Sequence, residues 1–225
     1  MDMEIFPFDV KASIAHVRML SVVSVIEQQE ADLLVKELEV LLDAFNKGEV
    51  VITVEDEDCH TVIENFLIEK LGDIGKKVHT GRSRNDQVLT ALRLYTLHKM
   101  QELASVNVQV MTSFLDFVER NKNTPLPGYT HTQQAMLSSF GHWGLSFVEG
   151  LINDHEVLRT ATEVNNQNPL GTAAGFGVSL PLDRDSTKRE LGFTKNIVNS
   201  LFAQASRGKF ESLTLEALAQ IMLTL

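Results

Sequence analysis

The stretch "HTGRSRNDQV", residues 79–88, gathers two arginines, an asparagine and an aspartate just before apolar residues that recur at helical spacing. Ser83, Asn85 and Asp86 are residue types that cap the first turn of a helix. Arg82, Arg84 and the Asn85 amide would then lie near unpaired backbone N–H groups at the positive end of a helix dipole. A guanidinium group can bind a carboxylate with two parallel hydrogen bonds. The stretch therefore predicts a carboxylate-binding site, with ordinary capping and Arg–Asp pairing as the alternative interpretation.

A candidate proton-transfer group lies in "PGYTHTQQA", residues 127–135, which contains Thr130 and His131. An apolar stripe at helical spacing follows these two residues and comprises Met136, Phe140, Trp143, Phe147 and Leu151. The stripe predicts a helix that begins near its first member, with the imidazole at the helix entrance. Because histidine can donate, accept or shuttle a proton near neutral pH, His131 is a candidate for proton transfer.

Two more segments carry polar or flexible groups. "EDEDCHT", residues 55–61, combines carboxylates with His60 at the predicted start of another helix. "NPLGTAAGFG", residues 168–177, is a Gly- and Ala-rich turn in which the backbone can approach a ligand or another subunit closely. Each segment alone is a weak signal.

Long amphipathic helices must position these groups, because apolar residues recur at helical spacing almost throughout the chain. One stripe contains Leu34, Leu38, Leu41 and Phe45. Another contains Leu103, Val106, Val110, Phe114 and Phe117. The strand-like run "EVVITVE", residues 49–55, is too short to define a sheet. The pattern predicts an all-α bundle of long helices, whose Pro- and Gly-containing breaks present the polar motifs.

Composition excludes several classes of function. With 225 residues, of which 44% are hydrophobic, the chain can bury a sizeable core. The 30 acidic against 20 basic residues give a formal net charge of -10, and no basic stripe is present to neutralise phosphates, so nucleic acid is not an expected partner. No run approaches the length of a membrane span, and the first residues lack the pattern of a signal peptide. A soluble, cytoplasmic protein is predicted.

A metal centre is not expected from the sequence. Cys59 is the only cysteine, which rules out an internal disulfide and favours a reducing compartment. No two histidines stand at positions i and i+4, so a zinc site is predicted to be absent. Core or surface roles are predicted for His16, His98, His142 and His155.

Both ends of the chain suggest a fragment. The last segment, "ESLTLEALAQIMLTL", is an apolar stripe without a helix stop signal, and nothing precedes Asp2 to form a first element. The expectation is that the natural protein continues, with a short final helix as the alternative.

In this order, the motifs resemble one family closely. "HTGRSRNDQV", "GYTHTQQA", "NPLGTAAGFGVSLPLDRDSTKRELGF" and "ASRGKFE" are similar to the corresponding regions of argininosuccinate lyases, within the fumarase/aspartase superfamily of homotetrameric helical enzymes. The resemblance runs from about Asp2 to the last residue. It implies reversible cleavage of argininosuccinate to arginine and fumarate, a β-elimination that needs neither a metal nor an organic cofactor.

The resemblance also implies roles for individual residues. Ser83, Arg84 and Asn85 match the family loop that binds the substrate carboxylates. Thr130 and His131 match its second conserved region, in which the threonine binds substrate and the histidine assists proton transfer. Abstraction of a proton beside a carboxylate creates an aci-carboxylate dianion, which preplaced cations and amides stabilise.

Three further positions match the family. Asp58 and His60 correspond to an "EDIH" segment that lines the pocket, with Cys59 in place of an aliphatic residue. Asp2 falls where the family has an aspartate near the guanidinium end of the substrate.

The sequence also departs from the family pattern. In "THTQQAML", Thr132 replaces the usual leucine and Leu137 stands where a proline is common. The third signature, a "GSS-MP-KKNP" loop that supplies the catalytic serine and a lysine, does not occur in this sequence. The chain by itself is therefore expected to be inactive.

These observations favour an all-α lyase subunit of the fumarase/aspartase type. A small, mostly helical N-terminal domain is predicted for residues 1–81 and a truncated central bundle for residues 82–225. The expected partners are a small-molecule substrate and further copies of the chain in a homotetramer. The competing hypothesis is a non-enzymatic protein, either a crystallin-like structural member or a degenerate paralogue that only assembles.

Overall fold

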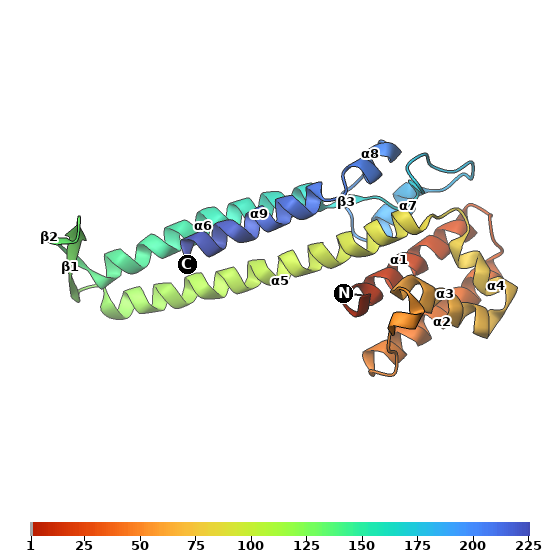
Figure 1. The fold of residues 1–225 in the computed structure, drawn as a ribbon, viewed down its shortest axis with the longest axis horizontal. Helices are drawn as coiled ribbons and strands as arrows, with labels where there is room; N and C mark the ends of the chain where they lie inside the picture. Colours follow the sequence, from red (N-terminus) through yellow and green to blue (C-terminus); the bar gives the residue numbers. More distant parts are fainter. Residues whose placement is uncertain (1) are drawn as a thin grey trace. The chain divides into compact units, whose positions relative to one another are not determined.

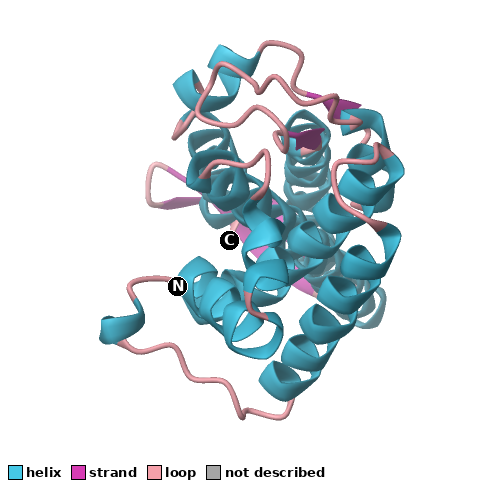
Figure 2. Ribbon diagram, turned by 90° about the vertical axis from the view of Figure 1, so that its right-hand side faces the viewer, coloured by secondary structure: helices cyan, strands magenta, loops and turns pink. Residues whose placement is uncertain are grey.

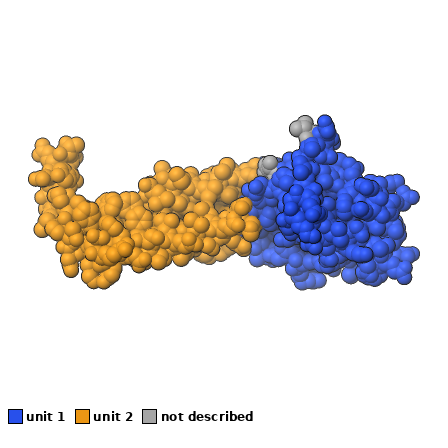
Figure 3. Space-filling view, turned by 90° about the horizontal axis from the view of Figure 1, so that it is seen from below, with its two compact units in different colours: residues 1–97, 166–207 blue, residues 98–165, 208–225 orange. Residues whose placement is uncertain are grey.

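The computed structural model describes residues 2–225, the side chain of Val54 excepted, and helices account for most of them (Figure 2). The predicted all-α class is confirmed. The chain forms two compact units (Figure 3): unit 1 contains the residues up to 97 together with 166–207, and unit 2 contains 98–165 and 208–225. The predicted domain boundary at residue 81 stays a prediction. Within residues 2–225, no helix combines the length and the apolar character of a membrane span.

The core of unit 1 lies among its first helices, α1 (Asp2–Val22), α2 (Gln28–Asn46) and α3 (Cys59–Leu71), followed by the short α4 (Asp73–Lys76). The stripe predicted on α2 is confirmed, since Leu34, Leu38 and Leu41 are all buried. Phe45, at the end of this stripe, stacks on Phe6 of α1 with ring centroids 4.6 Å apart. Burial of these apolar side chains fixes α1 against α2 and α3.

The rest of unit 1 consists mainly of short elements. They are the 3-10 helices η1 (Val54–Asp56) and η2 (Lys77–His79), the first part of α5 (Arg84–Asn121), the parallel strands β3 (Gln167–Asn168) and β4 (Lys195–Asn196), and the helices α7 (Arg184–Glu190) and α8 (Ser200–Ala205). The strand-like run at residues 49–55 is irregular and ends in η1. Its β-branched residues therefore did not indicate a strand.

Unit 2 is built from the later part of α5, the strands β1 (Pro125–Thr130) and β2 (Gln133–Ser139), and the helices α6 (Phe140–Asn165) and α9 (Lys209–Thr224). Helices α6 and α9 lie side by side (Figure 1). Their core includes Leu151, Leu158 and Ile221. A buried hydrogen bond from Asn107 Nδ2 to the Leu151 carbonyl ties α5 to α6.

A β-hairpin replaces the predicted helix entrance in this unit. Strands β1 and β2 pair in antiparallel fashion, and their two-residue turn consists of His131 and Thr132, with φ values of 48° and 64°. The helix begins only at Phe140, and Met136 lies in β2 with 78% of its surface exposed. The prediction of a helix that begins near Met136 was therefore wrong. Turns of this type usually contain Asn or Gly, and neither occupies the turn here, so the usual hairpin signal was missing.

The apolar stripes of unit 2 are only partly buried. On α5, Leu103, Val110 and Phe114 pack against the core, whereas Val106 is 50% exposed. A groove of about 490 Å³ is lined mainly by apolar side chains of α5 together with Trp143 of α6. At the end of α9, Met222 is 72% exposed. Apolar surface of this extent is typical of helices that pack against a partner.

Candidate functional site

The predicted carboxylate-binding residues lie at the start of α5. Ser83 directly precedes the helix, and its hydroxyl accepts a hydrogen bond from the Asn85 N–H at 3.3 Å. Asp86 Oδ1 accepts the Ser83 N–H in return at 3.0 Å. The predicted cap is confirmed, and it places Arg84 and Asn85 in the first turn, at the positive end of the helix dipole.

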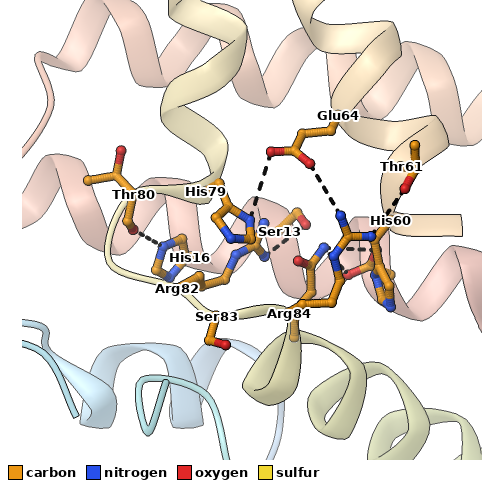
Figure 4. Close-up of polar contacts among 12 residues, drawn as sticks. Ser13, His16, His60, Thr61, Glu64, His79, Thr80, Arg82, Ser83 and Arg84 are labelled. Carbon is orange, nitrogen blue, oxygen red and sulfur yellow. Dashed lines mark hydrogen bonds and ion pairs between the residues drawn. The ribbon is translucent and has the colours of Figure 1, made fainter. Parts of the chain in front are cut away.

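The Arg84 guanidinium holds a carboxylate of the protein itself. Its Nη1 donates to both oxygens of Asp58, at 2.6 and 2.8 Å. Its Nη2 lies 3.5 Å from Glu64 (Figure 4). Arg84 and Asp58 are both partly exposed, at 39% and 26% of their side-chain surface. Both bonds to Asp58 come from one guanidinium nitrogen, and this contact is the Arg–Asp pairing that the alternative interpretation expected.

Asp58 is held in its ionised form. It caps α3, accepting hydrogen bonds from the Thr61 backbone N–H at 2.8 Å and the Thr61 hydroxyl at 2.9 Å. Partial burial alone would raise the pKa of Asp58, but these two bonds, with the positive charge of Arg84, lower it below its ordinary value. An ionised carboxylate at this position competes with an anionic ligand for Arg84 and pairs with a cationic one.

Two further side chains in this region are tied to their neighbours. Asp86 Oδ2 accepts the backbone N–H groups of Gly171 and Ala173, each at 2.9 Å, and so anchors the Gly- and Ala-rich turn to α5. Arg207 Nη2 donates to Asn85 Oδ1 at 3.1 Å and to the Asn85 carbonyl at 3.3 Å. The Asn85 Nδ2 donates to Ser83 Oγ at 3.3 Å, so both ends of this amide are held by neighbouring side chains.

His60 is oriented by a buried carboxylate. Its Nδ1 lies 2.5 Å from Asp9 Oδ2, and Gln87 Nε2 donates to the two Asp9 oxygens at 3.0 and 3.1 Å. Asp9, His60 and Gln87 are all at most 3% exposed. Because an ionised Asp9 can only accept, His60 Nδ1 carries the hydrogen, which leaves its Nε2 available to another partner.

A buried basic cluster supports the loop before α5. Arg82 is 8% exposed and donates from Nη1 to Ser13 Oγ at 3.0 Å. His16 is fully buried, and its Nε2 donates to the Thr80 carbonyl at 2.8 Å (Figure 4). Burial, and then the charge of Arg82, lower the pKa of His16 from 6.5 to about 3, against the opposing effect of the bond to Thr80. His16 is therefore neutral in the folded chain.

This pKa predicts acid sensitivity. The unfolded chain protonates His16 below pH 6.5 whereas the folded chain does not, so stability falls as pH decreases from 6.5 toward 3. We expect His16→Gln to reduce the loss of unfolding free energy between pH 7 and pH 5 by about 2 kcal/mol. Urea unfolding at both pH values measures this, with His98→Gln, at an exposed histidine, as the control. An identical pH dependence in wild type and His16→Gln would show that His16 does not cause the acid sensitivity.

Comparison with known proteins identifies the family of this chain. The family model described as "Lyase" matches residues 1–225. The chain belongs to the lyase family. It is 48% identical over 222 residues to the argininosuccinate lyase of Sorangium cellulosum, covering 99% of this chain and 52% of that protein. It is 44% identical over 220 residues to that of Thermotoga neapolitana, covering 98% of this chain and 55% of the relative.

A solved structure of a fumarate lyase:delta crystallin from Brucella melitensis, bound to cobalt, superposes on this lyase chain with a TM-score of 0.84. The superposition covers 99% of this chain and 53% of that one at 17% sequence identity, so it bears on the fold alone. The chain spans about half the length of the curated relatives that it matches.

Within unit 1, this lyase chain brings together most of the predicted site residues. Ser83, Arg84 and Asn85 lie at the start of α5, and Asp58 and His60 lie at the start of α3. Asp2 begins α1, where its charge acts on Cys59. Thr130 and His131 belong to unit 2, at the end of β1 and in the hairpin turn, and both are exposed.

Sequence reasoning missed several residues that organise the site. Asp9 is the buried acid of α1, Gln87 binds it from α5, and Arg207 holds Asn85. Arg207 lies within the quoted motif "ASRGKFE", which could have indicated it. An acid in the apolar context of α1 was the available signal for Asp9, because buried carboxylates need partners.

Proposed function

We propose that the full-length protein containing these residues cleaves argininosuccinate to arginine and fumarate by reversible β-elimination. The observation that carries the proposal is the contact of Arg84 Nη1, at the start of α5, with both oxygens of a carboxylate. The names of the curated relatives supply the substrate. The reverse reaction would add a guanidinium nitrogen of arginine across the double bond of fumarate.

In this proposal a substrate carboxylate displaces Asp58 from Arg84. Because the substrate carboxylate takes the place of Asp58, the Arg84 guanidinium is paired with a carboxylate both before and after binding. The Asn85 amide and the positive end of the α5 dipole further stabilise the same anion. When a proton is removed beside the bound carboxylate, charge builds on its oxygens, and these preplaced donors lower the barrier.

The remaining site residues receive their roles from the resemblance. Thr130 binds substrate and His131 assists proton transfer, while Asp58 and His60 line the pocket. Asp2 approaches the guanidinium end, where a carboxylate is the expected partner for a cation. The catalytic serine and lysine would come from sequence outside these 225 residues. No metal or organic cofactor takes part in the proposed reaction.

Assembly and cellular role belong to the same proposal. The groove on α5 and the exposed apolar residues of α9 support packing against further copies, which we propose to be a homotetramer. A cytoplasmic location and a role in arginine biosynthesis follow from the activity named for the relatives.

The activity is testable in a chimera in which residues 1–225 replace the matching segment of the Sorangium cellulosum enzyme. The parent enzyme then supplies the remaining part of the subunit, including its catalytic loop. We expect fumarate release from argininosuccinate, followed by ultraviolet absorbance, with the parent enzyme as the positive control. A chimera that folds and assembles like the parent but releases no fumarate would favour the crystallin-like alternative.

Arg84 provides the most specific prediction for substrate binding. Arg84→Lys keeps the charge but cannot make two parallel bonds, and the loss of one charge-assisted bond costs about 1.5–3 kcal/mol. We expect kcat/KM of the chimera to fall by about ten- to a hundredfold. Arg18→Lys is the matched control, because Arg18 is half exposed and pairs with surface carboxylates of unit 1. An unchanged kcat/KM in the Arg84 variant removes this assignment.

A further inference from the structure

Three metal-ligating side chains meet inside unit 1. Cys59 and His60 are consecutive in the first turn of α3, and Asp9 comes from α1, 51 positions before His60. Their ligand atoms all lie within 4.8 Å of one another. Cys59 and Asp9 are 0% exposed and His60 is 3% exposed. The fold thus assembles a thiol, an imidazole and a carboxylate that sequence spacing alone did not connect.

A fourth side chain contacts this cluster and also carries an unsatisfied atom. The Gln87 amide contacts both Asp9 oxygens through Nε2, while its Oε1 is buried and has no hydrogen-bond partner among the residues that the structure describes. A buried carbonyl oxygen without a partner is costly. A half-turn of the amide would exchange Nε2 and Oε1 and direct a lone pair toward the cluster.

The charge around Cys59 favours a cation. The Asp9 carboxylate lies within 4.8 Å of the Cys59 sulfur, and the charges of Asp2 and Asp58 also act on this thiol. The negative potential that disfavours a bare thiolate attracts a positive ion. A divalent metal would neutralise these carboxylates and stabilise the thiolate as its ligand.

We propose that Asp9, Cys59 and His60 bind a zinc ion, with Gln87 Oε1 as the fourth ligand. Sulfur, nitrogen and oxygen donors at about 2.0–2.3 Å in tetrahedral geometry suit Zn²⁺. On binding, the thiol proton leaves to solvent, the His60 hydrogen moves from Nδ1 to Nε2, and Nδ1 coordinates the ion. The contact between His60 and Asp9 opens as both groups turn to the ion.

The ion would link α1 to the start of α3, next to the Asp58 cap. It acts as a structural ligand of unit 1, and its binding can be measured without an assay of the proposed lyase activity. Because it binds the folded chain and not the separated ligands of the unfolded chain, Zn²⁺ raises the stability of unit 1.

Cobalt provides a direct test, since Co²⁺ substitutes for Zn²⁺ and a thiolate ligand gives a near-ultraviolet charge-transfer band. Cys59 is the only cysteine in the sequence, so such a band can come only from this site. We expect titration of the reduced 225-residue chain with Co²⁺ to produce the band at one equivalent, and Zn²⁺ to abolish it by displacement. A titration that reaches saturating Co²⁺ without the band overturns the proposal.

Variants at Cys59 and Gln87 test whether these two side chains are ligands. Cys59→Ser is expected to lose the band, and Gln87→Leu to weaken Co²⁺ binding by at least about tenfold. His98→Asn, at an exposed histidine paired with Glu102, is the matched control and should keep both band and affinity. As a second measurement on wild type, Zn²⁺ should raise Tm and magnesium should not. A Tm unaffected by Zn²⁺, or equal Co²⁺ affinity in the Gln87 variant and wild type, contradicts the assignment.

Discussion

Replacement of His131 by asparagine is expected to lower kcat of the chimera by about two orders of magnitude or more, the usual scale for a proton-transfer group. The fold should survive, because His131 is exposed in the hairpin turn with φ of 48°, a conformation that asparagine tolerates well. Asparagine retains a polar side chain but cannot exchange a proton near neutral pH. The variant therefore separates the imidazole's chemistry from the shape of the turn.

Steady-state assays of fumarate release measure this effect. His142→Asn is the matched control, because His142 is also exposed in unit 2 and its Nδ1 pairs with Ser138 Oγ. Circular dichroism and light scattering establish that both variants fold and assemble as the chimera does. Wild-type turnover in the His131 variant would show that the residue serves only the turn.

The second large effect is the loss of catalysis when the 225 residues stand alone. They should associate, because Trp143 and Met222 of unit 2 expose 47% and 72% of their surface and the groove on α5 is largely apolar. The 225 residues lack the loop that supplies the serine base in the family that the sequence resembles. Removal of a principal proton-transfer group costs several kcal/mol of barrier, so turnover should lie near the detection limit.

Light scattering and a fumarate-release assay on this chain test the two parts of that prediction separately. A monodisperse monomer would contradict the assembly argument. Robust turnover would show that the missing loop is dispensable. The chimera, measured in parallel, establishes that the assay detects activity once the loop is present.

The sequence predicted the features that depend on local chemistry. The stripe of Leu34, Leu38 and Leu41 became a buried helix face, and Ser83 capped α5 where polar residues precede an apolar run. Both outcomes follow from short-range spacing, which one sequence reveals. The all-α class followed in the same way.

Features that depend on contacts between residues distant in sequence could not be predicted from residue spacing. The hairpin was misread because its turn contains His131 and Thr132 instead of the usual Asn or Gly, and the following apolar residues fit helical spacing. The hydrogen bond between Asp9 and His60 joins two helices that are distant in sequence, so the spacing of residues does not reveal it. Similarly, Asp86 was predicted as a cap, but its second oxygen binds the turn at residues 171–173.

The most direct measurement for the proposed function is kcat/KM of the chimera for argininosuccinate, with arginine and fumarate quantified together. We expect equimolar products and a kcat/KM within about tenfold of the parent enzyme, a factor that corresponds to about 1.4 kcal/mol of altered transition-state binding. A chimera that assembles like the parent but falls more than about a thousandfold below it would contradict the claim that residues 1–225 carry a competent substrate site.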